Sequence, residues 1–237
     1  MPPKFGTSGL RGLVTELTPD LVQSYTRAFL AACPTGGALH LGWDLRDSSP
    51  TIAASVRAAV TKAGVDLVDH GVLPTPALAL AALGAKQAAI MVTGSHIPAD
   101  RNGLKFYVPT GEIAKSDEAA ITAARGHTAP AASTPGRVTS QPGAALAAYG
   151  ARYVTGFGPH ALSRMRIGVY QHSSVARDVL MQVLADLGAT PVAIARSDTF
   201  VPVDTEAVDP DTRAQLARWC HDHNLDALVS TDGDADR

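Results

Sequence analysis

Short apolar runs alternate with segments of helical periodicity along this chain, and that alternation limits the possible folds more than any other feature of the sequence. In residues 19–32 the apolar side chains recur at the spacing of one helix face. Residues 38–43 (ALHLGW) instead form a short apolar run of strand length. Repetition of this β-α-β order implies a parallel sheet with helices on its faces.

The same two patterns predict the remaining elements. Helices are expected at 19–32, 51–63, 77–84, 115–124, 144–154, 173–188 and 210–224. Strands are expected at 38–43, 65–69, 88–92, 104–108, 166–170, 190–195 and 225–230, with 104–108 at a sheet edge or in a hairpin. The predicted fold class is therefore α/β, as two successive α/β domains with mostly parallel mixed sheets.

A segment rich in small and polar residues separates the two halves. Residues 126–143 contain three prolines and three glycines, which is typical of a linker or a long surface loop. We therefore expect a first domain at 1–135 and a second at 144–237. The second half stops at an acidic loop directly after a predicted strand, so we expect the chain to be part of a longer protein whose later domains are missing here.

Charge and apolar patterning argue against several classes of protein. The net charge is −2, without the clustered lysines and arginines that a nucleic-acid groove requires. The longest apolar run, at 77–85, is far shorter than the roughly 20 residues of a membrane span. The start of the chain lacks the apolar region of a secretory signal, and Cys33 and Cys220 are not in a C-x-x-C pair. We predict a cytoplasmic protein with reduced thiols and no nucleic-acid or membrane partner.

The segment T93-G-S-H-I-P98 is the first candidate for chemistry. It follows the predicted strand 88–92, so Ser95 is expected at the carboxyl edge of a parallel sheet, where ligands of such sheets bind. Gly94 permits unusual backbone angles beside the hydroxyl. The alternative is a Gly-Ser turn with an incidental histidine, and the sequence has no G-x-S-x-G elbow of a hydrolase here.

Lys105 closes the second candidate segment, N102-G-L-K105. A lysine at the start of a strand could reach back toward Ser95 and neutralise a phosphoryl group, or act in acid/base catalysis after a pKa shift. The alternative is a solvated lysine on an edge strand.

The loop D232-G-D-A-D236-R237 is the third candidate segment. Three carboxylates in alternate positions can converge on one hard cation, and carboxylate oxygens suit Mg²⁺ or Ca²⁺. An EF-hand is excluded because Arg237 stands where the sharp turn requires glycine. The other alternative is a polar surface loop.

The N-terminal segment F5-G-T-S-G-L-R-G12 is the fourth candidate. Its small residues predict a flexible loop that presents Arg11 to a phosphate. It does not match the G-x-x-x-x-G-K-[ST] pattern of a nucleotide P-loop, and the alternative is a glycine-rich tail.

In this order and approximate spacing, the four segments resemble the α-D-phosphohexomutases, in particular the bacterial phosphomannomutase/phosphoglucomutase branch. The resemblance covers residues 5–237. One departure is Ile97, which stands where the commoner family form has asparagine. The resemblance implies a four-domain protein, of which this chain would contain the first two domains.

The resemblance also implies roles for individual residues. Ser95 would carry the phosphoryl group, and a phosphoserine oxygen would join three carboxylates in holding Mg²⁺. These carboxylates belong to Asp232, Asp234 and Asp236. Other side chains would line the site of phosphoryl transfer, with Arg11 and Lys105 as candidates for acid/base catalysis. The lining residues are Arg11, His96 and Lys105, with Arg237 against the phosphoserine or the substrate.

The implied activity is an intramolecular phosphotransfer. A phosphosugar, hexose 1-phosphate of mannose or glucose, would be interconverted with hexose 6-phosphate through the phosphoserine and a hexose 1,6-bisphosphate, which also serves as activator. Two alternatives stay open: a non-catalytic metal-binding fragment and a metal-dependent sugar phosphatase. A further polar set matches a family motif after the first long strand, but a hydrogen-bond network at a helix start explains it equally well. The set comprises Asp44, Arg46, Ser48 and Ser49.

Overall fold

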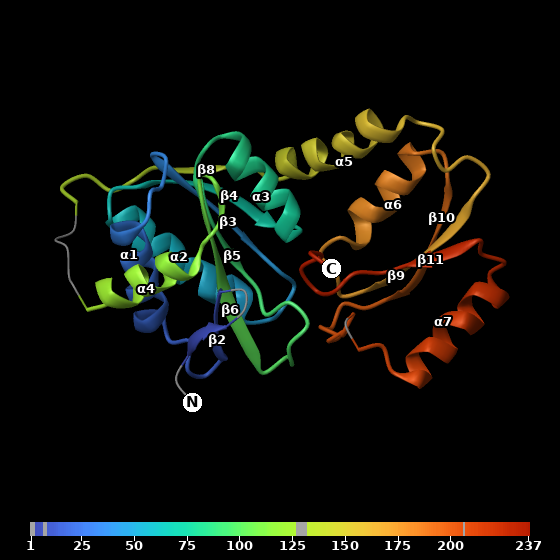
Figure 1. The fold of residues 1–237 in the computed structure, drawn as a ribbon, viewed down its shortest axis with the longest axis horizontal. Helices are drawn as coiled ribbons and strands as arrows, with labels where there is room; N and C mark the ends of the chain where they lie inside the picture. The colour runs from blue at the N-terminus through green and yellow to red at the C-terminus, as the bar shows by residue number, and fades with distance from the viewer. Residues whose placement is uncertain (1–2, 7–8, 127–131, 206) are drawn as a thin grey trace.

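The structure, a computed structural model, describes residues 3–6, 9–126, 132–205 and 207–237. Two α/β units lie next to each other, and the C-terminal residues lie between them (Figure 1). The predicted class, two successive α/β units with mostly parallel sheets, is confirmed.

The first unit is built on an eight-stranded mixed sheet. Its strands follow the order β1 (Lys4–Gly6), β2 (Gly9–Leu13), β6 (Arg101–Val108), β5 (Ala88–Val92), β3 (Ala38–Trp43), β4 (Asp66–Val72) and β8 (Val138–Ser140), with β7 (Gly111–Glu112) paired to β6. Strands β5, β3, β4 and β8 are parallel, whereas β6 is antiparallel to both of its long neighbours. The parallel strands bring their carboxyl ends to one edge of the sheet.

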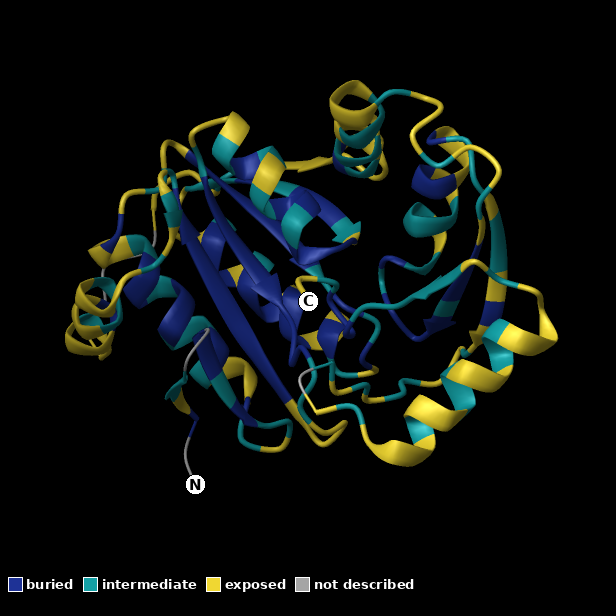
Figure 2. Cartoon of the chain, turned by 45° about the vertical axis from the view of Figure 1, so that its right-hand side comes forward, coloured by how far each residue is buried: buried dark blue, intermediate teal, exposed yellow. Residues whose placement is uncertain are grey.

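Helices cover both faces of this sheet, which explains why its central strands are apolar on both sides. Helices α1 (Pro19–Ala32), α2 (Ser49–Lys62) and α4 (Lys115–Ala124) share a core with one face, and α3 (Thr75–Gly84) packs on the other. Every residue of β5 is buried, and the central strands of the sheet are dark in Figure 2. Over the described residues, no helix has both the length and the apolar character needed to cross a membrane.

The second unit has a parallel three-stranded sheet in the order β10 (Thr190–Arg196), β9 (Arg166–His172) and β11 (Ala227–Val229). Helix α6 (Arg177–Asp186) packs against β9 and β10, and α7 (Pro210–Asp222) lies beside β11. Helix α5 (Ala144–Phe157) contacts both α3 and α6, and its Ala145 is buried in the core of the first unit. It therefore connects the two units.

Of the two alternatives predicted for 104–108, the edge strand is wrong, whereas the hairpin arm is confirmed by the antiparallel pairing of β6 with β7. Strand β6 lies inside the sheet between β2 and β5, and it is buried from Asn102 to Val108. The reason is the N-terminal segment, which forms the antiparallel β1–β2 hairpin and covers this edge of the sheet. Arg11 consequently lies on a strand and not in the predicted flexible loop, although residues 7–8 of that segment are outside the described part.

Two further boundaries differ from expectation. Part of the predicted linker, residues 138–140, forms β8 and extends the first sheet beside β4. Residues 127–131 of the same linker lie outside the described residues. The helix expected from 173 begins only at Arg177, because the preceding residues form a polar turn. The division of the chain at 135 and 144 stays a prediction.

A pair of buried histidines joins β3 to β4. The rings of His40 and His70 stack, and His40 Nδ1 lies 2.8 Å from His70 Nε2. His40 Nε2 lies 2.9 Å from the carbonyl Oε1 of Gln87, so Nε2 donates and Nδ1 accepts the proton of His70. This pattern requires the His40 ring to be neutral, and a second proton on His70 would sit on its buried Nδ1, which has no hydrogen-bond partner among the described residues. Burial, followed by the neighbouring His40, lowers the pKa of His70 to about 4.

We therefore expect the contribution of His70 to the free energy of unfolding to fall as pH drops from about 6.5 to 4. In this window the unfolded chain binds protons that the folded pair excludes, and the loss should reach about 2–3 kcal/mol. Urea unfolding at several pH values measures it. The stability of His70→Phe relative to wild type should therefore rise by this amount as pH falls across the window, whereas His160→Gln, at an exposed position, should follow wild type. Equal slopes in wild type and His70→Phe would contradict the assignment.

Candidate active site

Ser95 lies in the loop that follows β5, at the carboxyl edge of the first sheet. Its backbone has a φ of 53°, a region that side chains other than glycine seldom adopt. The amide of Ser95 donates to Thr93 Oγ1 at 2.8 Å, which helps to hold this conformation. The hydroxyl is buried and donates to Asp232 Oδ2 at 2.5 Å, so the serine meets the acidic loop from the other half of the chain.

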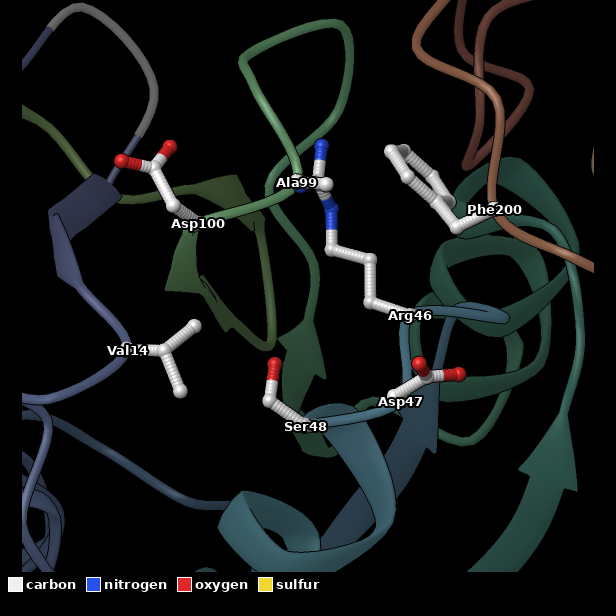
Figure 3. Close-up of a pocket in the computed structure, with 7 residues that line it drawn as sticks. All are labelled: Val14, Arg46, Asp47, Ser48, Ala99, Asp100 and Phe200. Atoms are coloured by element: carbon white, nitrogen blue, oxygen red, sulfur yellow. The ribbon is translucent and has the colours of Figure 1, made fainter.

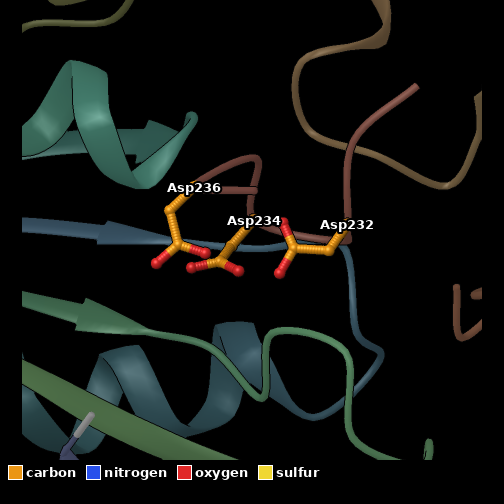
Figure 4. A group of neighbouring side chains, drawn as sticks. All are labelled: Asp232, Asp234 and Asp236. Atoms are coloured by element: carbon orange, nitrogen blue, oxygen red, sulfur yellow. The ribbon is translucent and has the colours of Figure 1, made fainter. Parts of the chain in front are cut away.

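The acidic loop is packed between the units. Asp232 and Asp234 have no exposed surface, and the side chain of Asp236 is 30% exposed. One carboxylate oxygen from each residue lies within 4.8 Å of the others. Figure 4 shows the three carboxylates side by side. The alternative of a polar surface loop is therefore wrong.

Lys105 supplies the nearest positive charge. From the interior strand β6 its Nζ donates to Asp234 Oδ2 at 2.8 Å and to Asp236 Oδ2 at 2.5 Å, and its side chain is only 3% exposed. The alternative of a solvated edge lysine is contradicted by this burial. Burial alone would lower the pKa of Lys105, but the two carboxylates outweigh it and the pKa lies above its ordinary value. Lys105 is therefore a permanent cation near neutral pH.

The pKa values of Asp232 and Asp234 shift in opposite directions because Lys105 donates a hydrogen bond to Asp234 and not to Asp232. Burial, followed by the charge of Asp234, raises the pKa of Asp232 to about 6. Burial also acts to raise the pKa of Asp234, but Lys105 and the hydroxyl of Thr75 reverse the effect and lower it below its usual range.

The residues present fit a divalent metal ion. One oxygen of Asp232 and one of Asp234 are buried without a hydrogen-bond partner among the described residues, which is costly for a carboxylate. Three carboxylates and one ammonium leave a net charge of −2, which a divalent cation balances. Oxygen ligands are those that Mg²⁺ prefers.

Thr75 was not singled out from the sequence, yet it anchors the acidic loop to the first unit. At the first turn of α3, its amide donates to the carbonyl of Asp234 at 2.9 Å. Its hydroxyl donates to Asp234 Oδ2 at 2.5 Å. The positive end of the helix dipole also favours an anion at this position. The only sequence signal is the T-P pair at a helix start, which says nothing about a partner 159 positions away.

The second unit holds the same loop from the other side. His172 Nε2 donates to the carbonyl of Thr231 at 2.9 Å, and the hydroxyls of Ser174 and Thr231 are 2.7 Å apart. The amide of Val175 donates to the carbonyl of Gly233. The turn before α6 is therefore a support for the acidic loop, which explains why the helix begins later than predicted.

His96 and Arg237 lie at the open side of Ser95. Arg237 Nη1 donates to His96 Nδ1 at 3.1 Å, and that same nitrogen lies 3.3 Å from Ser95 Oγ. The guanidinium of Arg237 is exposed, so an anion approaching Ser95 would meet it.

Arg11 is the predicted site residue that is least directly connected to the other residues of the site. It lies on β2 opposite Gly103, and its charge acts on the neighbouring Arg46. Among the described residues its guanidinium has no hydrogen bond or ion pair. The structure thus brings Ser95, His96, Lys105, Arg237 and the three aspartates together, with Arg11 beside them.

Arg46 is the second residue whose contribution the sequence did not reveal. Asp44 does stabilise the start of α2, since Ser49 Oγ donates to it at 2.5 Å, as the hydrogen-bond interpretation expects. The Arg46 side chain forms an ion pair with Asp44 and extends to the loop that contains Ser95. It is 1% exposed and donates to four carbonyl oxygens of the loop that contains Ser95. These belong to Ser95, Ile97, Pro98 and Arg101, at 2.6–2.9 Å.

This arrangement can support phosphoryl transfer. A buried hydroxyl lies against carboxylates that can hold a metal ion, with a lysine and two arginines near enough to balance added negative charge. Such a site favours a phosphate group over a neutral ligand.

Comparison with known proteins agrees with this geometry. The family described as phosphoglucomutase/phosphomannomutase, alpha/beta/alpha domain I, matches residues 2–129. The chain is 49% identical to a phosphomannomutase of Sinorhizobium fredii, over 100% of this chain and 52% of that protein. It is 46% identical to a phosphomannomutase of Salmonella muenchen, over 98% of this chain and 49% of that protein.

A solved structure shares the fold. The phosphoglucomutase/phosphomannomutase family protein of Burkholderia thailandensis superposes with a TM-score of 0.74 at 23% identity, over 96% of this chain and 52% of that one.

Fold and site together define a two-unit α/β protein with an acidic loop beside a buried serine. The chain belongs to the phosphoglucomutase/phosphomannomutase family. It spans about half the length of the curated relatives it matches.

We expect Lys105→Met to lower the free energy of unfolding by about 3–5 kcal/mol without metal, because it leaves Asp234 buried and unpaired. Added Mg²⁺ should raise the unfolding temperature of this variant more than that of wild type. Thermal unfolding with EDTA or Mg²⁺ measures both effects. Lys115→Met, which removes an exposed pair with Glu118, is the control and should change little. A similar small effect of both substitutions would show that Lys105 does not neutralise the loop.

Proposed function

We propose that this chain forms the phosphoryl-carrying part of a phosphohexomutase that interconverts hexose 1-phosphate and hexose 6-phosphate. The hydrogen bond between Ser95 and Asp232 carries the proposal, because it joins a candidate nucleophile from one unit to the candidate metal loop of the other. The names of the relatives, phosphomannomutases, favour mannose phosphate, with glucose phosphate as a related substrate.

Mg²⁺ would be held by Asp232, Asp234 and Asp236, together with an oxygen of phosphorylated Ser95. When bound, the ion supplies charge neutralisation for the phosphoryl group. Lys105 stays protonated and keeps the carboxylates oriented, so it acts as a fixed cation and not as a base. Arg237 and Arg11 would receive the phosphate oxygens, and His96 orients Arg237.

Each half-reaction exchanges one bond for another. A hydroxyl oxygen of the hexose phosphate forms a bond to phosphorus as the bond from phosphorus to Ser95 Oγ breaks. The sugar hydroxyl loses its proton as the new bond forms, and Ser95 Oγ takes up one proton as its bond to phosphorus breaks, so each half-reaction moves one proton from the sugar to the serine. The product of the first half is a hexose 1,6-bisphosphate. After it turns around, Ser95 takes the other phosphoryl group and the positional shift is complete.

Binding of the phosphate that does not react requires contacts that the residues above do not provide. The curated relatives are about twice as long, and we place those contacts in further C-terminal domains of the same protein. We place the protein in the cytoplasm, supported by the two free cysteines.

Incubation of the protein with glucose 1,6-bisphosphate and Mg²⁺ should add one phosphoryl group, which peptide mass mapping should locate on Ser95. Ser95→Ala should abolish the addition, whereas Ser140→Ala, at an exposed position on β8, should not. Release of inorganic phosphate in place of labelling would support the phosphatase alternative. Modification elsewhere, with full activity in Ser95→Ala, would contradict the proposal.

The acidic loop should bind Mg²⁺ more tightly once Ser95 is phosphorylated, by about tenfold or more, because a phosphate oxygen joins the carboxylates. Isothermal titration of the phosphorylated and dephosphorylated forms measures the difference. Asp236→Asn should weaken both affinities without unfolding the protein, since this side chain is partly exposed. Equal affinities of the two forms would mean that Ser95 and the loop do not share an ion.

A further inference from the structure

Phe200 connects the two units through a contact with Arg46 that has no role in the chemistry proposed above. It lies in the segment between β10 and α7 of the second unit. Its ring faces the guanidinium of Arg46 in the first unit, with Arg46 Cζ 4.1 Å from the ring centroid. Figure 3 shows the ring beside the end of the Arg46 side chain, at one wall of a cavity of about 270 Å³.

The two terminal nitrogens of the Arg46 guanidinium are fully occupied, because they donate to the four carbonyls of the Ser95 loop. Nε lies 3.3 Å from Asp44 in an ion pair but has no hydrogen-bond partner among the described residues. The flat faces of the guanidinium remain for further contacts. An aromatic ring on such a face is attracted by the cation and excludes water that would compete for the same donors.

The same ring reaches the acidic loop. A Cβ atom placed on Gly233 would lie 3.3 Å from Phe200 Cε2 and 3.2 Å from the carbonyl oxygen of Ser95. Phe200, Gly233 and the Ser95 backbone are thus in close mutual approach, and Gly233 stands between Asp232 and Asp234.

From these contacts we propose that Phe200 is a positioning residue that sets the Ser95 loop against the acidic loop. It presses Arg46 onto the loop carbonyls from the second unit and limits how far Gly233 can move. The role deepens the proposed function, because phosphoryl transfer depends on the distance between Ser95 and the metal loop. The ring belongs to no core cluster and is only half-buried, so a purely structural role would be small.

The test compares Phe200→Leu, which keeps an apolar side chain without the aromatic face, with Phe200→Tyr, which keeps the face. Phe157→Leu on α5 is the control, since that ring is 71% exposed and far from the site in sequence. These variants leave Arg46 in place, because its replacement would leave four carbonyls without a donor and could prevent folding.

Two readouts separate the inference from the proposed function. Amide hydrogen exchange of residues 94–101 reports the order of the loop without any activity, and labelling of Ser95 by glucose 1,6-bisphosphate at saturating donor reports transfer. Phe200→Leu should speed exchange and slow labelling by about fivefold to tenfold, with an unchanged unfolding temperature. Phe200→Tyr and Phe157→Leu should stay within twofold of wild type.

Exchange in Phe200→Leu equal to that of wild type would overturn the inference, whatever the activity. Faster exchange accompanied by a matching fall in unfolding temperature would also overturn it, because the ring would then be a general stabilising contact. If wild type is not labelled at Ser95, the proposed function fails, and hydrogen exchange alone decides whether Phe200 positions the loop.

Discussion

The structure depends on groups that compensate the negative charge of the buried acidic loop. Asp232 and Asp234 are removed from water between the two units, and two carboxylates in such a place repel each other strongly. Lys105 from the first sheet and Thr75 from α3 provide the opposing charge and hydrogen bonds. Because the partners come from the first unit and the carboxylates from the second, this compensation also holds the units together.

The position of β6 follows from this requirement. Lys105 is a strong partner only because its strand lies inside the sheet, covered by the β1–β2 hairpin. The β1–β2 hairpin therefore has an electrostatic effect on Lys105, although it is formed by the glycine-rich N-terminal segment. It excludes water from the lysine and strengthens its interaction with the carboxylates.

A second network sets the conformation of the Ser95 loop. The loop has little regular structure, and its carbonyl oxygens would need water if Arg46 did not bind them. Asp44 holds Arg46 from one side and also accepts from Thr93, directly before Gly94. A single buried ion pair thus organises the turn that presents the serine, while Lys105 organises the loop that faces it.

The sequence by itself determined the helices, the long parallel strands and the candidate residues, but not the short strands β1, β2, β7 and β8. Local periodicity located the helices, and the motifs identified Ser95, Lys105 and the three aspartates, because residue type and spacing are properties of the chain. It did not determine which strand was interior, that residues 138–140 would extend the sheet, or that Arg46, Thr75 and Phe200 would face the site. Those facts depend on contacts between segments 49 to 159 positions apart. Only the tertiary structure decides such contacts, because the burial that gives them strength exists only after the two units have folded together.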